Sequence, residues 1–564
     1  MTGLLGAGKR LGASLPGFAV VLLASLACAA PVQAGEARFA WFEYSGTDGE
    51  SLAPGQYRNP ILAGYYPDPS VVRVGEDFYL VNSTFAWFPG IPVFHSRDLV
   101  HWRQIGNAID RPDMLNFEGL TLSRGVFAPA ITWHEGTFYI ANTCVDCGGN
   151  FVITARDPAG PWSDPAWLPT VEGIDPSLFF DDDGSAWLIN NRAPAGPALY
   201  DGHRALWIER FDPVGLKMLG DPKMVVDGGI DPSKRPIWIE GPHIYKHNGK
   251  YYLMAAEGGT SVNHSEVILR ADRVDGPYRP APPGANPILT QRDLPAGRPN
   301  PVSAAGHADI VELPGGGFAA VFLATRPYDY AKDYYNLGRE TFLLPVDWSG
   351  EWPVILGKGL PIPLAGEAPL PPVRGAAPMT GSFTAREEFG RADLGPEWMA
   401  MRATRYALDR GELVLVPGRD GLGDLGKPAF VARRQQHNEA VAETELEFAP
   451  DEGEMAGLAA LQNDDYFLTI AVVREDGRTL VRVARRAGPD DPRAGATVAE
   501  APLAKPGKVR LKLAIHGGRF DFAYATGGEW TPLASDVDGT NLSTATAGGF
   551  VGTMIGPFAQ GPRD

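Results

Sequence analysis

Five segments of this chain repeat one pattern, in which a strand-like run, a polar or glycine-containing turn and a second strand-like run follow one another. The segments are PDPSVVRVGEDFYLV (67–81), APAITWHEGTFYIA (128–141), DPSLFFDDDGSAWLI (175–189), GPHIYKHNGKYYLMAA (241–256) and HADIVELPGGGFAAVF (307–322). Glycine-containing turns between runs rich in β-branched and aromatic residues are typical of β-hairpins. Each interval between the turns has room for two more short strands. The repeat therefore predicts a five-bladed β-propeller, five small sheets arranged radially.

One distinctive side chain stands near the start of each first strand. The set comprises Asp68, Phe127, Asp175, Glu240 and His307. The innermost strands of a propeller line its central channel, so equivalent strand starts converge at one mouth. We therefore expect two aspartates, a glutamate, a histidine and an aromatic ring in one pocket.

The three carboxylates fit the hydrolysis of a glycosidic bond. This reaction needs an acid that protonates the leaving oxygen and a carboxylate that activates water or attacks the anomeric carbon. Glu240, at a buried strand start, suits the acid, and Asp68, between two prolines, suits a rigid base. Asp175 would add a negative charge that keeps the Glu240 proton in place. Asp231 also lies in an Asp-Pro-Ser, but a loop sequence follows it, so we interpret it as structural.

The propeller pattern covers residues 59–353, and other patterns flank it. Residues 354–382 are rich in Pro, Gly and Ala, which is typical of a semi-rigid linker. From residue 383 to 564, apolar and polar residues alternate with turns between, which predicts an antiparallel β-sandwich. Residues 35–58 form an N-terminal extension. The whole mature chain is thus expected to be all-β.

The first 34 residues are typical of an export signal. Lys9 and Arg10 precede an apolar run at 18–30 that is too short to span a bilayer comfortably, and Val-Gln-Ala at 32–34 offers a cleavage site. The protein is therefore expected to be periplasmic or extracellular. After cleavage only Cys144 and Cys147 remain, and an oxidising compartment favours a local disulfide between them.

The formal net charge of -17 argues against partners that are nucleic acids or anionic membranes, because both favour basic surfaces. No segment beyond the signal is long and apolar enough to span a membrane. The sequence leaves the oligomeric state open.

At these motifs the sequence resembles glycoside hydrolase family 43, in particular its bacterial β-xylosidases and α-L-arabinofuranosidases. NPILAGYYPDPSVVRV resembles the segment with the general base, GIDPSLFFDDDG the segment with the aspartate that adjusts the acid's pKa, and IEGPHIYKHNGKYYLMAAEGGT the general-acid segment. The resemblance places these roles on Asp68, Asp175 and Glu240. It also implies inversion at the anomeric carbon, in which the base activates water.

The resemblance extends to five substrate-binding candidates. They are Phe85, Trp87, Phe127, His307 and Arg339. Phe127 stands where the family often has tryptophan. The histidine lies beneath the substrate in the family and in some members helps to hold calcium, so no cofactor is implied as a requirement and calcium stays open. The C-terminal region resembles a concanavalin-like jelly roll whose loop closes one side of the site, with Phe550 as a candidate for the closing aromatic.

A closed pocket favours removal of one terminal sugar. The leading hypothesis is an exo-acting β-D-xylosidase that acts on pentose-containing oligosaccharides in hemicellulose degradation. An α-L-arabinofuranosidase, or an enzyme with both activities, is the alternative, because the two sugars can place equivalent hydroxyls alike. Less favoured are a non-catalytic glycan-binding protein and an endo-arabinanase, which usually lacks the sandwich.

Overall fold

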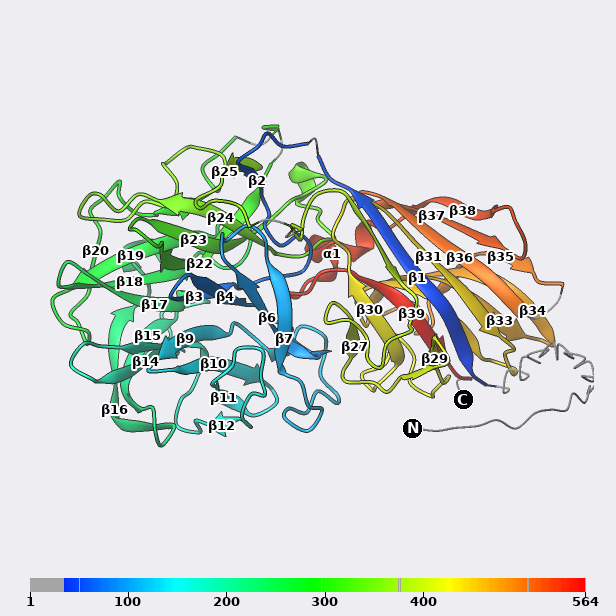
Figure 1. Cartoon of the computed structure of the whole chain (residues 1–564), viewed down its shortest axis with the longest axis horizontal. Helices are drawn as coiled ribbons and strands as arrows, with labels where there is room; N and C mark the ends of the chain where they lie inside the picture. Colours follow the sequence, from blue (N-terminus) through cyan, green and yellow to red (C-terminus); the bar gives the residue numbers. More distant parts are fainter. Residues whose placement is uncertain are drawn as a thin grey trace, which may run out of the picture.

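The computed structural model describes residues 35–562 apart from residues 50, 296, 300, 374, 376, 505 and 506. The expected export signal at 1–34 lies outside the described residues. The regular secondary structure of the described chain is almost entirely β-strand, and the chain forms two bodies side by side, a propeller and a sandwich (Figure 1).

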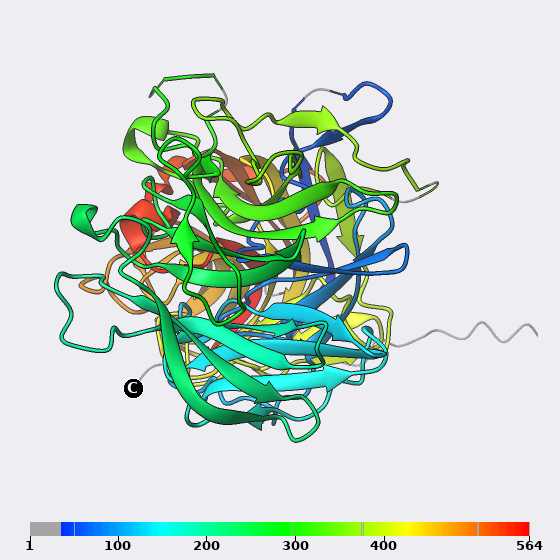
Figure 2. The same ribbon diagram turned by 90° about the vertical axis from the view of Figure 1, so that its left-hand side faces the viewer.

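The propeller has five antiparallel sheets, one for each repeat. The first is β3 (Ser70–Val74), β4 (Asp77–Val81), β6 (Gly90–Ser96) and β7 (Arg103–Ile109), and the second is β9 (Ala130–His134), β10 (Thr137–Val145), β11 (Gly149–Ala155) and β12 (Ala166–Trp167), with β8 (Gly125–Val126) beside β10. The third is β13 (Ile174–Phe180), β14 (Ala186–Arg192), β15 (Ala205–Asp212) and β16 (Lys217–Asp227). The fourth is β17 (Glu240–His247), β18 (Lys250–Glu257), β19 (Ser265–Ala271) and β20 (Arg279–Pro280), with β21 (Leu289–Thr290) on β19. The fifth is β22 (Ser303–Glu312), β23 (Phe318–Thr325) and β24 (Glu340–Val346). The predicted five-bladed propeller is confirmed, and Figure 2 views it with the sandwich behind.

The five predicted turns each join the first two strands of a blade. Their glycines Gly75, Gly136, Gly184, Gly249 and Gly316 all have φ between 65° and 95°. Glycine adopts this left-handed region without the steric cost that a Cβ imposes, so each turn can be tight. The innermost strands β3, β9, β13, β17 and β22 contact one another in order, and β22 returns to β3. The ring is thereby closed around a central channel.

The start of the propeller segment completes the fifth blade. Leu62 bridges Thr341 of β24, and Asn59 exchanges two hydrogen bonds with Leu343, each 2.9 Å long. The linker also returns here, because β25 (Ala365–Glu367) pairs with β2 (Gln56–Arg58). The first and last parts of the propeller are therefore joined by backbone pairing.

Two eight-stranded sheets form the sandwich. One contains β26 (Phe383–Glu387), β28 (Ala407–Asp409), β29 (Glu412–Leu415), β1 (Ala37–Thr47), β31 (Glu439–Phe448), β36 (Gly507–His516), β37 (Arg519–Ala525) and β38 (Thr531–Asp538). The other contains β35 (Ala496–Pro502), β34 (Arg478–Ala487), β33 (Tyr466–Glu475), β32 (Met455–Asn463), β39 (Met554–Gln560), β30 (Ala429–Arg434), β27 (Met399–Met401) and β5 (Trp87–Phe88). The few helical turns are η1 (Pro232–Lys234), η2 (Tyr330–Lys332), η3 (Thr540–Leu542) and α1 (Thr544–Ala547). In β31, buried residues alternate with partly exposed ones, as a strand with one face on a core requires.

Two strands cross between the parts that the sequence separated. The expected N-terminal extension, residues 35–58, contains β1, which lies between β29 and β31 inside the sandwich (blue in Figure 1). Within the propeller segment, β5 pairs with β27 of the sandwich. One hydrophobic core includes Tyr65 of the propeller segment and Phe430 of the sandwich. The two bodies therefore share an apolar interface.

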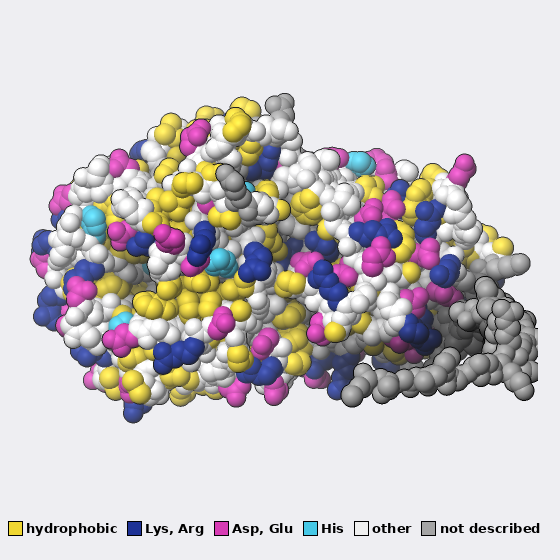
Figure 3. All heavy atoms as spheres, viewed as in Figure 1, with side chains coloured by type: hydrophobic (Ala, Val, Ile, Leu, Met, Phe, Trp, Pro, Cys, Tyr) yellow, Lys and Arg dark blue, Asp and Glu magenta, His cyan; other side chains and the backbone are white. Residues whose placement is uncertain are grey.

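The outer surface carries many charges of both signs. Acidic and basic side chains are interspersed over both bodies on the face in Figure 3. Among residues 35–562 as described, no helix is long and apolar enough to cross a membrane.

Candidate active site

The starts of the innermost strands meet at a cavity of about 730 Å³. It is lined by Asp68, Phe85, Ser123, Arg124, Phe127, Ala128, Val145, Ile174, Asp175, Arg204, Trp238, Glu240, Gly259, Thr260, His307, Arg339, Gly549 and Phe550. All five residues picked out by the repeat lie here. The volume is in the ~300–1,000 Å³ range of pockets that bury most of a small organic ligand.

The backbone turns these side chains toward the channel by a shared device. Asp68, Asp175 and His307 have φ of 51°, 55° and 53°, a region that side chains other than glycine seldom adopt. The strand register shifts between Ile174 and Ser177, and likewise between Gly306 and Asp309. Such bulges redirect a side chain and are frequent beside active sites. Local backbone strain thus accompanies the residues that face the cavity.

Asp68 is held as a buried ion pair. Arg339 Nη1 donates to Asp68 Oδ1 at 2.7 Å, and Ser83 Oγ donates to Oδ2 at 2.5 Å. The same Arg339 Nη1 donates to Thr260 Oγ1 at 3.2 Å, and Nη2 donates to the Phe550 carbonyl at 3.4 Å. This arginine connects the first blade, the fourth blade and the sandwich, and a charge-assisted contact of this kind orients the carboxylate.

Glu240 and Asp175 lie in surroundings that favour the protonated form of a carboxyl group. Burial, and then the negative charges of Asp175 and Asp68, raise the pKa of Glu240 well above its usual range, while Arg339 and Arg204 act in the opposite direction. Burial and the charge of Asp68 raise the pKa of Asp175 to about 7. Asp175 Oδ2 accepts a hydrogen bond from the Gly241 amide at 3.2 Å, which fixes it beside the Glu240 backbone. The site thus holds an anchored carboxylate and a carboxyl group that retains its proton.

His307 packs against Gly241, the residue that follows Glu240. Burial lowers the pKa of its imidazole to about 4, so the ring is neutral at physiological pH. Gly241 has φ of 56°, and a Cβ at this position would lie 2.8 Å from the His307 ring. Only glycine therefore fits beside the His307 ring at the position after Glu240.

The polar groups around His307 bear on whether calcium binds there. Calcium takes six to eight oxygen ligands. Nearby Asp309 already uses Oδ2 to accept from Ser70 and Oδ1 to accept from Tyr245. Within the described part of the chain, no group of three or more His, Cys, Asp or Glu side chains could hold a metal ion.

Three phenylalanines form one wall of the cavity. Phe85 stacks on Phe550 with ring centroids 5.9 Å apart, and Phe127 meets each of them edge-on at 5.1 and 5.8 Å. The Arg339 guanidinium lies 5.6 Å from the Phe550 ring. Phe550 follows α1 in the sandwich, so a loop of the C-terminal body closes this side.

Trp87 is not brought to the cavity. Its side chain is fully buried, and its ring packs on Phe430 at 5.8 Å in the core shared with the sandwich. The physical reason is the pairing of β5 with β27, which turns this segment away from the channel. Asp231 also lies elsewhere, at the start of η1, where it contacts Ser233 and Lys234.

Several residues in or beside the cavity were missed by sequence reasoning. Ser83 and Thr260 orient Asp68 or Arg339, and Arg204 and Trp238 line the wall beside Glu240. Trp238 stands two residues before Glu240, so its nearness in sequence was an available signal. Arg204 directly precedes β15, the third strand of the third blade, where the repeat carries no comparable signal.

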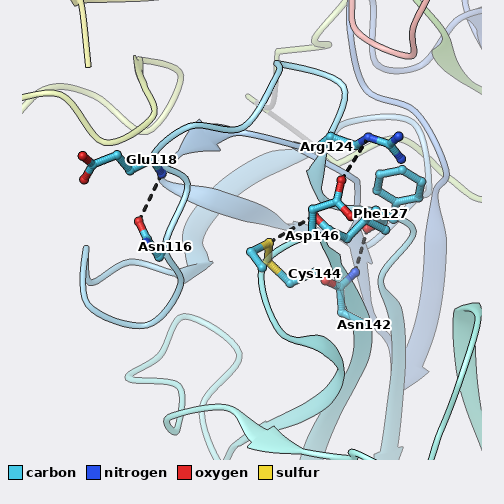
Figure 4. The surroundings of a disulfide bond; sticks show 9 residues. Asn116, Glu118, Arg124, Phe127, Asn142, Cys144 and Asp146 are labelled. Atoms are coloured by element: carbon cyan, nitrogen blue, oxygen red, sulfur yellow. Dashed lines mark hydrogen bonds and ion pairs between the residues drawn. A yellow bond between two sulfur atoms is a disulfide. The ribbon is translucent and has the colours of Figure 1, made fainter. Parts of the chain in front are cut away.

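A disulfide joins Cys144 and Cys147 at the end of β10, as the sequence favoured. Its loop borders the cavity, because Val145 lines the wall and Asp146 pairs with Arg124 at 3.3 Å (Figure 4). The cross-link therefore fixes a short stretch of the cavity rim.

The comparisons with known proteins agree with this chemistry. Residues 57–353 match the family described as glycosyl hydrolases family 43. This chain belongs to glycoside hydrolase family 43. It is therefore a glycoside hydrolase, and residues 386–564 match the description "Beta xylosidase C-terminal Concanavalin A-like domain".

Relatives of this family 43 enzyme match over nearly the whole chain. A xylosidase/arabinosidase of Butyrivibrio fibrisolvens is 36% identical over 89% of this chain and 95% of its own length. A non-reducing end α-L-arabinofuranosidase of Bacteroides ovatus is 33% identical over 91% and 92%. The crystal structure of a GH43_12 protein from a capybara gut metagenome has a TM-score of 0.84 and 38% identity, covering 93% of this chain and 99% of that one. The arrangement of propeller and sandwich is thus shared along the whole length.

Proposed function

We propose that this enzyme removes a terminal β-D-xylose unit from xylo-oligosaccharides, with inversion at the anomeric carbon. The observation that carries the proposal is the cavity itself, which is lined by Asp68 and Glu240 and completed by Phe550 of the sandwich. A pocket closed on one side suits a chain end better than the middle of a polymer.

In the proposed mechanism, each carboxyl group has one role. Asp68, oriented by Arg339 and Ser83, removes a proton from the attacking water. Glu240 donates its proton to the leaving oxygen. The negative charge of Asp175 favours the protonated form of Glu240 beforehand. Inverting hydrolysis requires no cofactor, because water is the nucleophile, its proton passes to the base, and the proton of the acid passes to the leaving oxygen.

An α-L-arabinofuranosidase, or an enzyme with both activities, is the second candidate. The names of the two relatives above favour it, because one combines both sugars and the other names arabinofuranose. Hydrolysis of paired aryl β-D-xylopyranoside and α-L-arabinofuranoside, with xylo-oligosaccharides alongside, separates the candidates. A dominant xyloside rate with xylose released from chain ends supports the proposal. A dominant arabinofuranoside rate replaces it, and no rate on either sugar in folded protein would favour a glycan-binding protein.

The proposed mechanism uses no calcium ion, and this can be tested with a chelator. The donor groups near His307 lead us to expect that dialysis against a chelator leaves kcat/KM unchanged. Activity that is lost on chelation and restored by calcium would instead assign the ion a place in the site.

We also propose that the enzyme is exported. The basic start, apolar run and cleavage motif within residues 1–34 support this, and so does the disulfide, since such bonds persist in oxidising compartments. The mass of the protein recovered from the periplasm or medium tests it. A mature chain that begins at Gly35 is expected, and an uncleaved cytoplasmic chain would contradict export.

A further inference from the structure

One wall of the cavity has no role in the mechanism above. Trp238, Arg204 and Gly259 line the cavity, Arg204 packs against the Trp238 ring, and Glu240 lies near enough for its charge to act on Arg204. Asp68 and Arg339 already have roles in the proposed mechanism, and the three phenylalanines form another wall of the cavity. A cavity of about 730 Å³ also offers more space than a single pentose needs.

Trp238 is held firmly although its side chain remains accessible. Its amide donates to the Gly202 carbonyl at 2.9 Å, and the Gly258 amide donates to the carbonyl of neighbouring Ile237 at 2.9 Å. These two bonds anchor the segment to the third and fourth blades. The backbone of Trp238 has φ of 53°, and the residue is 40% exposed. A large indole held exposed at a cavity wall is typical of a contact surface for a ligand.

Arg204 complements the indole. Its guanidinium carbon lies 5.2 Å from the Trp238 ring centroid, and its Nε donates to Asn191 Oδ1 at 2.9 Å. Among the described residues, its two Nη nitrogens donate to no protein acceptor, although the residue lines the cavity. Planar donors beside an apolar ring match a sugar, which has C–H groups on its ring faces and hydroxyls on its rim.

The position of Trp238 and Arg204 relative to Glu240 decides whether they contact the sugar in the inner pocket or the leaving sugar. The general acid must face the oxygen that leaves, whereas the base lies on the opposite side of the anomeric carbon. Trp238 is two residues before Glu240, and the positive charge of Arg204 acts to lower the pKa of Glu240. The wall therefore continues from the acid in the direction of the departing group.

We propose that Trp238 and Arg204 form the subsite for the leaving sugar, with the indole against its ring and the guanidinium on its hydroxyls. This assignment rests on the proposed function, because it takes Glu240 as the acid. Trp238 would then determine how well a saccharide leaving group binds, and this effect would not depend on which sugar lies in the inner pocket.

Two substrates with the same sugar in the inner pocket test this. One is a pentose disaccharide, and the other is the corresponding glycosyl fluoride, whose leaving group has no ring. Trp238→Ala is expected to lower kcat/KM for the disaccharide by about 2- to 12-fold, mainly through a higher KM, which corresponds to the loss of one aromatic contact. The loss on the fluoride is expected to be clearly smaller. Trp238→Phe is expected to recover part of the disaccharide activity.

Trp133→Ala is the matched control. Trp133 lies in β9, is 39% exposed and does not line the cavity, so both rates should stay at the wild-type level. Equal losses on the two substrates in folded Trp238→Ala would overturn the subsite, because the residue would then act on the acid. Undiminished disaccharide activity would overturn it as well. Failure of the wild-type enzyme on both substrates would contradict the proposed function itself and the subsite with it.

Discussion

At the scale of single residues, the site depends on side chains whose surroundings change their chemistry. Glu240 and Asp175 are both buried acids near Asp68, and the pKa of each is raised. Asp68 instead has a guanidinium at 2.7 Å. Three carboxyl groups in one cavity therefore have different surroundings, which is why we propose a different role for each.

Replacement of Asp175 by Asn tests this difference. The negative charge of Asp175 helps to raise the pKa of Glu240, so its removal lowers that pKa. The protonated acid is lost as pH rises through its pKa, and the basic limb of the kcat/KM profile should therefore move to lower pH. Asparagine keeps an oxygen for the Gly241 amide, so the fold should survive. A basic limb that stays in place or moves upward in folded Asp175→Asn would contradict this role.

The sequence indicated some of these residues and missed others for physical reasons. Asp68, Asp175 and Glu240 could be picked out because the repeat places them at equivalent strand starts. Trp87 was misplaced because a motif does not reveal that its segment pairs with a strand more than 300 residues away. Arg204 was missed because it reaches the cavity through its contact with Trp238, which precedes the next blade, and the repeat does not show such contacts between blades.

At the scale of elements, glycine turns and strand-like runs were enough to predict the blades. Each turn glycine has the positive φ that its hairpin needs, so the local signal and the final structure agree. The strand β1 gave no such indication, since its partners β29 and β31 come hundreds of residues later. Short-range patterns therefore predict hairpins well and long-range pairing poorly.

The disulfide at the end of β10 offers a test at this scale. Replacing both cysteines by serine removes a cross-link that closes a loop of only four residues, and we expect a loss of about 2 kcal/mol in unfolding free energy. The rim at Val145 and Asp146 should also loosen, which would raise KM more than it lowers kcat. Denaturation and steady-state kinetics measure both effects.

Reduction of the wild-type enzyme provides the control. A thiol reductant should lower its stability toward that of the Cys144→Ser/Cys147→Ser protein and leave the double variant unchanged. Equal stability of the wild-type enzyme and the double variant without reductant would show that the cross-link contributes nothing.

At the scale of the whole molecule, the propeller and sandwich are interlocked. The N-terminal strand β1 lies in the sandwich, β5 extends a sandwich sheet, and Phe550 reaches the cavity. Arg339 contacts the Phe550 carbonyl and Asp68 together. The sandwich is therefore part of the site and not only an appended module.

Phe550→Ala tests the contribution of the sandwich to catalysis. Loss of the ring opens the aromatic wall with Phe85 and Phe127, and we expect kcat/KM to fall by about 2- to 12-fold. The backbone carbonyl that meets Arg339 remains, so the fold should be retained. Thr546→Ala, at an exposed position of α1, is the control and should behave as wild type. Unchanged kcat/KM in Phe550→Ala would argue that the sandwich does not complete the site.

The most direct test of the whole account is the response of Glu240→Ala to aryl glycosides whose leaving groups differ in acidity. If Glu240 donates the proton, the variant should lose about 10²–10⁴-fold on poor leaving groups and much less on nitrophenol, which needs little protonation. Circular dichroism should confirm a wild-type fold. An equal loss on good and poor leaving groups, or near-normal activity on both, would contradict the assignment of Glu240 as the acid.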